Sequence, residues 1–221
     1  MTKSELFKEV LDYFRKNNPA PETELDHEDP YELLVSVILS AQCTDKRVNM
    51  VTPALFERFP TVHDLAKATF DDVFPYIKSV SYPNNKTRHL IGMAEMLVRD
   101  FKGQVPDNAE DLQKLPGVGR KTAHVVTSWL YRQPNLAVDT HVHRVSARLG
   151  LTVNAKNPLQ TELQLVKYIP KEDIPDAHHW LILHGRYICV ARNPKCEMCG
   201  LTNVCKYYRT IRKKTKQKVL T

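Results

Sequence analysis

The sequence predicts a nearly all-α fold, and three observations support this prediction. Apolar residues recur at helical spacing in one segment after another, sustained runs that alternate polar and β-branched residues are absent, and the 221 residues include only 7 glycines. A chain of this length can bury a sizeable core in one large domain or two small ones, so its stability does not require disulfide bonds. We therefore expect packed helices in two parts.

The predicted helices of the first part have clear boundaries. The first helix carries one apolar stripe, formed by Leu6, Phe7, Val10, Leu11 and Phe14, and the prolines at positions 19 and 21 end it. Asp29 caps the second helix and Pro30 occupies its first position, and this helix continues to Ala41. Further helices are predicted at residues 52–59, 62–68, 70–77 and 85–101.

Two more helices, on either side of a tight turn, form a helix-hairpin-helix. Residues 108–115 and 120–131 have helical character, and the turn between them is Pro116-Gly117-Val118-Gly119. Beyond Gln133-Pro134, helices are expected at residues 142–149, 160–168 and 174–189, followed by a cysteine-rich segment. The connection at residues 133–139 is the expected boundary between the two parts.

The charge of the chain favours a polyanionic partner. The formal net charge is +7 with an isoelectric point near 9.1, and basic residues gather at the C-terminal end: Arg209, Arg212, Lys213, Lys214, Lys216 and Lys218. A solvated, disordered terminus is the alternative interpretation of this segment. No leader and no apolar run of about 20 residues is present, so we expect a soluble cytoplasmic protein without a membrane segment.

Four cysteines follow the spacing C-x6-C-x2-C-x5-C: Cys189, Cys196, Cys199 and Cys205. Thiols stay reduced in the cytoplasm, so this cluster indicates metal or cluster ligation in preference to disulfides. Spacing alone leaves zinc and an iron–sulfur cluster open. In either case all four thiolates act as ligands, which predicts a structural role. Cys43 stands apart and is expected to be a small buried residue.

The hairpin turn is a candidate anion site. Gly117 and Gly119 allow the backbone to approach a ligand closely, and the N-terminus of the following helix presents amides and a favourable dipole, to which Arg120 adds charge. Such a contact reads the sugar-phosphate backbone and carries no sequence information. The alternative is an ordinary helical corner in which glycine serves only sterics.

Lys121 and Asp139 are the candidate catalytic residues. Lys121 lies in the first turn of the helix, where the dipole opposes a cation and favours the neutral amine that a nucleophile requires. Asp139 begins the next helix, where it caps the backbone or stabilises positive charge on a reacting sugar. A nearby carboxylate favours the charged amine, so these two influences on Lys121 oppose each other.

Three motifs in the same order closely resemble the endonuclease III family. They are Leu115-Pro116-Gly117-Val118-Gly119-Arg120-Lys121-Thr122-Ala123, Val138-Asp139-Thr140-His141-Val142-His143-Arg144-Val145 and the four-cysteine loop, and the likeness extends to Leu39-Ser40-Ala41-Gln42. The resemblance implies a six-helix barrel domain at residues 22–133, which holds the hairpin. It also implies an iron–sulfur cluster domain at residues 1–21 and 134–221, with DNA in the cleft between the domains.

The resemblance also implies the chemistry. Lys121 is implied as the nucleophile and Asp139 as its catalytic partner, and the four cysteines are implied as ligands of a [4Fe-4S] cluster, which decides against zinc. The implied substrate is duplex DNA with a damaged base or an abasic site. An oxidised or ring-saturated base is flipped out and displaced by Lys121, and β-elimination then cuts the strand on the 3′ side. A monomer that acts on the nucleoid is expected.

The residues expected to contact DNA come from several segments. Gln42 matches the family residue that fills the space of the flipped nucleotide, and Asn84 and Lys86 match residues near the DNA backbone. His141 is expected to line the site, beside the hairpin residues Gly117, Val118, Gly119 and Arg120. Tyr82 departs from the family, which carries an aliphatic wedge at this position, so lesion preference is left open.

Two alternative functions compete with this interpretation. Adenine glycosylases that act opposite oxidised guanine share the hairpin and the cluster, but they carry a glutamate where Val37 stands and lack a lysine at the position of Lys121. A non-catalytic DNA-binding module would gain nothing from a lysine set against the helix dipole. A transcription factor that reads base edges fits less well, because the turn presents glycines and amides.

Overall fold

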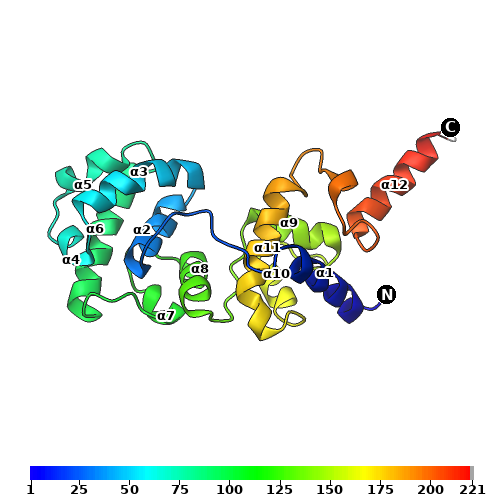
Figure 1. Ribbon diagram of the computed structural model, residues 1–221, viewed down its shortest axis with the longest axis horizontal. Helices are drawn as coiled ribbons and strands as arrows, with labels where there is room; N and C mark the ends of the chain where they lie inside the picture. Colours follow the sequence, from blue (N-terminus) through cyan, green and yellow to red (C-terminus); the bar gives the residue numbers. More distant parts are fainter. Residues whose placement is uncertain (220–221) are drawn as a thin grey trace. The chain divides into compact units, whose positions relative to one another are not determined.

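The computed structural model describes residues 1–219, with side chains to residue 212, and every regular element in this part of the chain is a helix. The predicted all-α fold is therefore confirmed. The basic side chains of Lys213, Lys214, Lys216 and Lys218 lie outside the described part. The chain divides into two compact units, one comprising Thr23–Gln133 and the other comprising Met1–Glu22 with Pro134–Thr221 (Figure 1).

The unit Thr23–Gln133 surrounds its most buried helix, α2. Its helices are α2 (Pro30–Ser40), α3 (Asp45–Arg58), α4 (Val62–Leu65), α5 (Phe70–Ile77), α6 (Pro83–Asp100), α7 (Ala109–Leu112) and α8 (Arg120–Tyr131). Eight of the eleven α2 residues are buried, so this helix is covered on nearly all sides. Side chains fix the start of five helices by accepting a hydrogen bond from the backbone N–H three residues ahead: Asp29, Thr44, Thr61, Thr69 and Asn108.

Helix α3 begins well before the residue 52 at which the apolar pattern predicts a helix. Thr44 caps this helix. Polar residues occupy the exposed side of its first turns, so an apolar stripe does not predict them. Pro53 lies inside this helix. The prediction was wrong here because a capping signal, and not periodicity, marks the start of α3.

The second unit combines the N-terminal helix with the C-terminal part of the chain. Its helices are α1 (Lys3–Asn17), α9 (Thr140–Leu149), α10 (Pro158–Leu165), α11 (Ile174–Tyr187) and α12 (Lys206–Val219), with short 3-10 turns at Lys171–Asp173 and Cys196–Met198. The predicted apolar stripe of α1 is buried. Phe14 stacks on Trp180 of α11, and Trp180 Nε1 donates to Asn18 O at 2.7 Å, so α1 packs beside α11 (Figure 1).

The basic C-terminal segment forms a helix as far as the structure describes it. This helix, α12, starts directly after Cys205 and continues to Val219. A disordered terminus was the alternative for this segment. Tyr207 and Tyr208 are half-buried, and their rings lie 4.8 Å and 5.8 Å from the guanidinium carbons of Arg148 and Arg212. None of the described helices is long and apolar enough to span a membrane.

Candidate functional site

The hairpin turn packs closely against α6. Gly117 has φ +79°, a left-handed conformation that glycine adopts without penalty. A Cβ atom at this position would lie 2.8 Å from the Cβ of His89 on α6, closer than real Cβ atoms approach. Both backbone conformation and space therefore require glycine at position 117. The Val118 side chain is only 6 % exposed and belongs to the core, so only its main chain is available for a ligand.

The N-terminus of α8 is open. Gly119 is its N-cap residue and supplies no side-chain hydrogen bond, whereas five other helices of this unit have side-chain caps. A Cβ at Gly119 would meet no atom within 4 Å, so a ligand can approach the backbone here. Arg120 and Lys121, the first two residues of α8, are exposed. The local arrangement combines backbone amides, a helix dipole and two cations, which suits a phosphate group.

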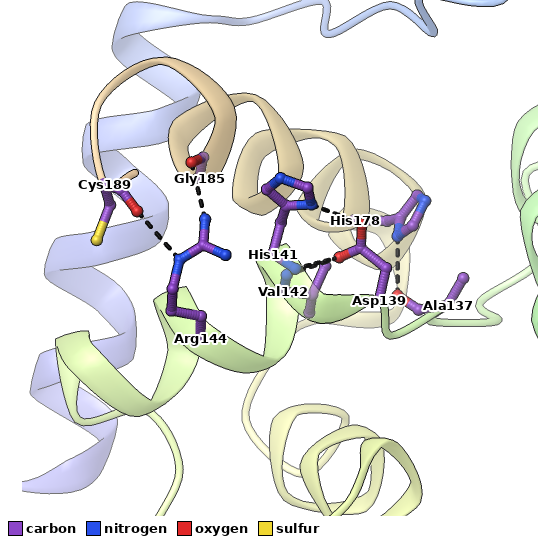
Figure 2. A network of polar contacts seen from close by, with 8 residues as sticks. All are labelled: Ala137, Asp139, His141, Val142, Arg144, His178, Gly185 and Cys189. Atoms are coloured by element: carbon purple, nitrogen blue, oxygen red, sulfur yellow. Dashed lines mark hydrogen bonds and ion pairs between the residues drawn. The ribbon is translucent and has the colours of Figure 1, made fainter. Parts of the chain in front are cut away.

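Asp139 is the N-cap of α9, and its two carboxylate oxygens have different partners. Oδ1 accepts hydrogen bonds from the backbone N–H groups of His141 and Val142, both at 2.8 Å. Oδ2 lies 3.0 Å from His141 Nδ1 (Figure 2). The Asp139 side chain is 14 % exposed and that of His141 is 29 % exposed. The carboxylate is thus held in one orientation while part of it stays accessible.

The backbone on either side of Asp139 is anchored to α11. His178 Nδ1 donates to Ala137 O at 2.8 Å, just before Asp139. On α9, the Arg144 guanidinium donates to Gly185 O at 2.9 Å and to Cys189 O at 3.3 Å (Figure 2). A Cβ at Gly185 would lie 3.0 Å from the Cβ of His141, so glycine permits the close approach of these two helices. Asp139 therefore projects from a helix with little freedom to move.

The four clustered cysteines line one cavity at the C-terminal end of α9, and this cavity is partly open to solvent. Burial, together with the neighbouring thiols, raises the pKa of Cys196, Cys199 and Cys205. Apposed, partly buried thiols of this kind need positive charge before they can ionise. An inorganic cation centre between them would supply that charge.

The cavity has the donor set of an iron–sulfur cluster. The four thiols surround a common space, which is what a polynuclear cluster with four thiolate ligands requires. When bound, such a cluster would hold together the two ends of the segment 189–205 through its four cysteines.

Arg148 and His184 complete the surroundings of the cysteines, and neither was singled out by the sequence. Arg148 Nη1 lies 3.5 Å from Cys189 Sγ and donates to Val190 O at 2.7 Å, which fixes the start of the loop. His184 Nε2 lies 3.7 Å from Cys199 Sγ. Burial lowers the pKa of His184 to about 4, so its ring is neutral at neutral pH. His184 is therefore a buried, uncharged neighbour of Cys199.

A second group of predicted residues lies at two loops of the unit Thr23–Gln133. Gln42 follows α2 with φ +55°, and Tyr82 precedes α6 with φ +56°. The Tyr82 side chain is 61 % exposed and Asn84 is also exposed. Ser81 Oγ donates to Gln42 O at 2.7 Å and joins the two loops. Lys86, expected near the DNA backbone, is instead buried, so that expectation was wrong.

The predicted residues fall into both units. Gln42, Tyr82, Asn84 and the hairpin with Lys121 belong to Thr23–Gln133, whereas Asp139, His141 and the four cysteines belong to the other unit. Within each unit, residues far apart in sequence are brought together. Arg144 reaches Cys189 across 45 residues, and Ser81 reaches Gln42 across 39 residues.

Comparisons with known proteins identify the segment that holds the hairpin and Asp139, and the four-cysteine segment. Residues 35–171 match the model of the HhH-GPD superfamily base excision DNA repair protein, and residues 189–205 match the iron-sulfur binding domain of endonuclease III. Endonuclease III of Rickettsia felis is 42 % identical over 94 % of this chain and 97 % of its own length. Endonuclease III of Escherichia coli K12 is 43 % identical over 90 % of this chain and 94 % of its own length.

Solved structures agree with the sequence relatives. A trapped endonuclease III–DNA covalent intermediate is 42 % identical with a TM-score of 0.88, and covers 96 % of this chain and 99 % of its own. A non-covalent endonuclease III–DNA complex is 41 % identical with a TM-score of 0.89, and covers 96 % of this chain and all of its own. The chain therefore belongs to the endonuclease III family, the DNA glycosylases and AP lyases of base excision repair that act on damaged pyrimidines and carry a [4Fe-4S] cluster.

Proposed function

We propose that this chain removes oxidised or ring-saturated pyrimidines from duplex DNA with Lys121 as the nucleophile and Asp139 as its catalytic partner. The observation that carries the proposal is the position of Lys121: an exposed amine in the first turn of α8, beside an uncapped helix N-terminus. A phosphate bound at that N-terminus holds a deoxyribose near the amine.

The chemistry proceeds in two stages. The neutral Lys121 amine attacks C1′ of the flipped nucleotide, the bond between C1′ and the base breaks, and the base leaves with the electron pair and takes up a proton. The C1′–O4′ bond of the sugar ring then breaks, O4′ takes up a proton and the nitrogen loses one, so that C1′ and the Lys121 nitrogen form a Schiff base. The Schiff base makes the C2′ proton acidic. Loss of that proton breaks the C3′–O bond, which cuts the strand on the 3′ side of the abasic site.

Asp139 stabilises the positive charge that develops on the sugar, and it accepts the proton that the attacking amine loses. The hydrogen bonds that Oδ1 accepts from two backbone N–H groups support this role, because they hold the carboxylate without neutralising it. His141, beside Oδ2, lines the same site.

The DNA contacts divide by chemistry. The main chain of Gly117, Val118 and Gly119, with the Arg120 side chain, binds the phosphate backbone and gives position without sequence information. Two loop residues act at the lesion: Gln42 fills the vacated space, and Tyr82 is the wedge that stacks into the duplex. Asn84, in the first turn of α6, contacts the DNA backbone. The exposure of Tyr82 and Asn84 supports these assignments.

We infer that Cys189, Cys196, Cys199 and Cys205 are the four ligands of the [4Fe-4S] cluster, because they line one cavity. We also infer a six-helix barrel domain at residues 22–133 and a cluster domain at residues 1–21 and 134–221. The two compact units support this division, and limited proteolysis at the connections near residues 22 and 133 tests it. A monomer in the cytoplasm, associated with the nucleoid, is the inferred working form, and light scattering with and without DNA tests the monomer.

Borohydride trapping tests the amine mechanism. The protein is incubated with duplex DNA that carries thymine glycol or an abasic site, in the wild-type form, as Lys121→Ala and as Lys114→Ala. Lys114 is an exposed lysine of the same hairpin, so it is the matched control. We expect covalent adducts on both substrates that disappear only in Lys121→Ala.

Two outcomes contradict parts of the proposal. Trapping on the abasic site alone leaves a lyase whose base preference differs from the proposed pyrimidines, and Tyr82 is then the first residue to change. Absence of trapping with intact DNA binding removes the catalytic assignment of Lys121 and favours a module that only binds DNA.

A further inference from the structure

Lys86 is a buried cation with an unusual set of partners. Its side chain is 5 % exposed, and Nζ donates to Leu39 O at 2.8 Å and to Ala41 O at 2.7 Å. No carboxylate in the described part of the chain forms an ion pair with it. Burial lowers the pKa of Lys86, so the carbonyl contacts compensate only part of the lost hydration. Burial of an ammonium group is unfavourable, so we expect the two carbonyl contacts of Lys86 to have a structural role.

The two carbonyls lie at the C-terminal end of α2, directly before Gln42. Helix α2 has no basic residue in its own last turn, so Lys86 supplies from α6 the positive charge that complements the helix dipole. The ammonium therefore fixes the point at which the chain leaves α2 and enters the left-handed conformation at Gln42.

The backbone of the same residue holds the other loop. The Lys86 N–H donates to Tyr82 O at 3.1 Å and closes the first turn of α6, which has no side-chain cap at Tyr82. Lys86 is thus bonded on both sides, through its ammonium to Leu39 O and Ala41 O and through its backbone N–H to Tyr82 O. Ser81 Oγ, which donates to Gln42 O, is a second tie.

We propose that Lys86 is a positioning residue that holds Gln42 and Tyr82 at a fixed spacing, so that both side chains enter the duplex together when a nucleotide is flipped. This inference rests on the DNA roles proposed above for Gln42 and Tyr82. Both residues have left-handed backbones, which cost roughly 1–2 kcal/mol each for residues other than glycine and persist only where surrounding contacts hold them. Without the ammonium, the Gln42 loop relaxes while Tyr82 stays, and the spacing is lost.

Three variants separate positioning from stability. Lys86→Met keeps the length of the side chain and removes the charge and both carbonyl contacts. Ser81→Ala removes the second tie at a half-buried position and is expected to fold normally. Tyr131→Phe is the matched control, because it removes one long-range hydrogen bond of the same unit, from Tyr131 OH to Val105 O, far from the loops in sequence.

Two readouts are compared with the thermal unfolding midpoint. Base unstacking is followed by the fluorescence of 2-aminopurine placed opposite a tetrahydrofuran abasic analogue in a duplex. This assay requires DNA binding but no catalysis. Excision of thymine glycol is followed under single-turnover conditions at saturating protein. We expect Lys86→Met to lower the fluorescence change and to slow excision roughly 10- to 100-fold, as a misplacement on the order of 1 Å does. We expect Ser81→Ala to act in the same direction, more weakly, and Tyr131→Phe to change only the midpoint.

The proposal is overturned if Lys86→Met leaves fluorescence and excision at the wild-type level. It is also overturned if Tyr131→Phe lowers the fluorescence change and the excision rate as much as Lys86→Met does for the same fall in unfolding midpoint. The fluorescence assay keeps this question apart from the proposed function. If the wild-type protein excises no damaged pyrimidine, the proposed function fails, whereas the Lys86 inference is still decided by the unstacking signal.

Discussion

Helices α8 and α9 begin in opposite ways, although both starts carry a candidate catalytic residue. The first backbone amides of α9 are closed by the Asp139 carboxylate, which accepts from two N–H groups at 2.8 Å. The N-terminus of α8 has Gly119 at the same position, with no side-chain cap and open space around it. The N-terminus of α9 is thus capped by a side chain of this protein, whereas the N-terminus of α8 has no side-chain cap and is accessible to a ligand.

This difference shows how the same backbone feature serves two purposes. An uncapped N-terminus gives up roughly 0.5–2 kcal/mol of stability that a good cap supplies, and it gains a site for phosphate. At α9 the cap is itself the carboxylate proposed to act in catalysis, so its orientation is set by the backbone before any substrate arrives. Substitutions at three positions test this contrast.

The largest effect is expected from Asp139→Asn. Asparagine caps helices as well as aspartate does, so the free energy of unfolding is expected to change by less than about 1 kcal/mol. The loss of negative charge, in contrast, is expected to slow base excision about 10²- to 10⁴-fold. Single-turnover excision and denaturant unfolding of the same preparation measure the two effects.

Asp139→Ala serves as the companion variant. It removes cap and charge together, so we expect the same loss of activity plus a loss of about 0.5–2 kcal/mol in the free energy of unfolding. Wild-type excision by Asp139→Asn would show that the carboxylate acts only as a helix cap, and the contrast with α8 would then have no catalytic meaning.

The local features of the sequence were sufficient to predict the main elements. Apolar stripes predicted α1, and the Asp29-Pro30 pair predicted the start of α2, because both signals lie within a few neighbouring residues. The four cysteines line one cavity as their short spacing suggests. Family resemblance, and not spacing, distinguished an iron–sulfur cluster from zinc.

The contacts that hold the site in place could not be predicted in this way. Arg144 bonds to Cys189, and Lys86 bonds to Leu39 and Ala41, across 45 and more residues of sequence. Such pairs exist only after the helices have packed, and no periodicity encodes them. The left-handed backbones of Gln42 and Tyr82 were equally hidden, because neither residue type signals a positive φ.

The next effect in size concerns the turn that leads into α8. Gly117→Ala places a Cβ 2.8 Å from the His89 Cβ at a residue with φ +79°. The left-handed conformation and the crowding together are expected to lower the free energy of unfolding by about 2–3 kcal/mol. Gly119→Ala meets no neighbour within 4 Å and is the matched control. Its expected loss is about 1 kcal/mol or less.

Denaturant unfolding of both alanine variants makes the measurement. Equal losses for the two variants would mean that α6 moves aside without cost, and the hairpin would then not be held rigidly against His89. A much larger loss at position 117 would locate the rigidity of the hairpin turn in that single contact.

The smallest effect is expected from Gly119→Asp, and its signature is a change of opposite sign in stability and affinity. An aspartate fits the open space, caps α8 and favours the helix dipole, so the free energy of unfolding is expected to rise by a few tenths to about 1 kcal/mol. The same carboxylate occupies the phosphate position and repels DNA, so binding to an abasic duplex is expected to weaken about tenfold, equivalent to about 1.4 kcal/mol.

Gly119→Ser, which caps without charge, separates the two causes: it should gain stability and lose less affinity. If Gly119→Asp binds DNA as the wild type does, the open start of α8 is not a phosphate site, and only α9 would then link a helix terminus to the chemistry.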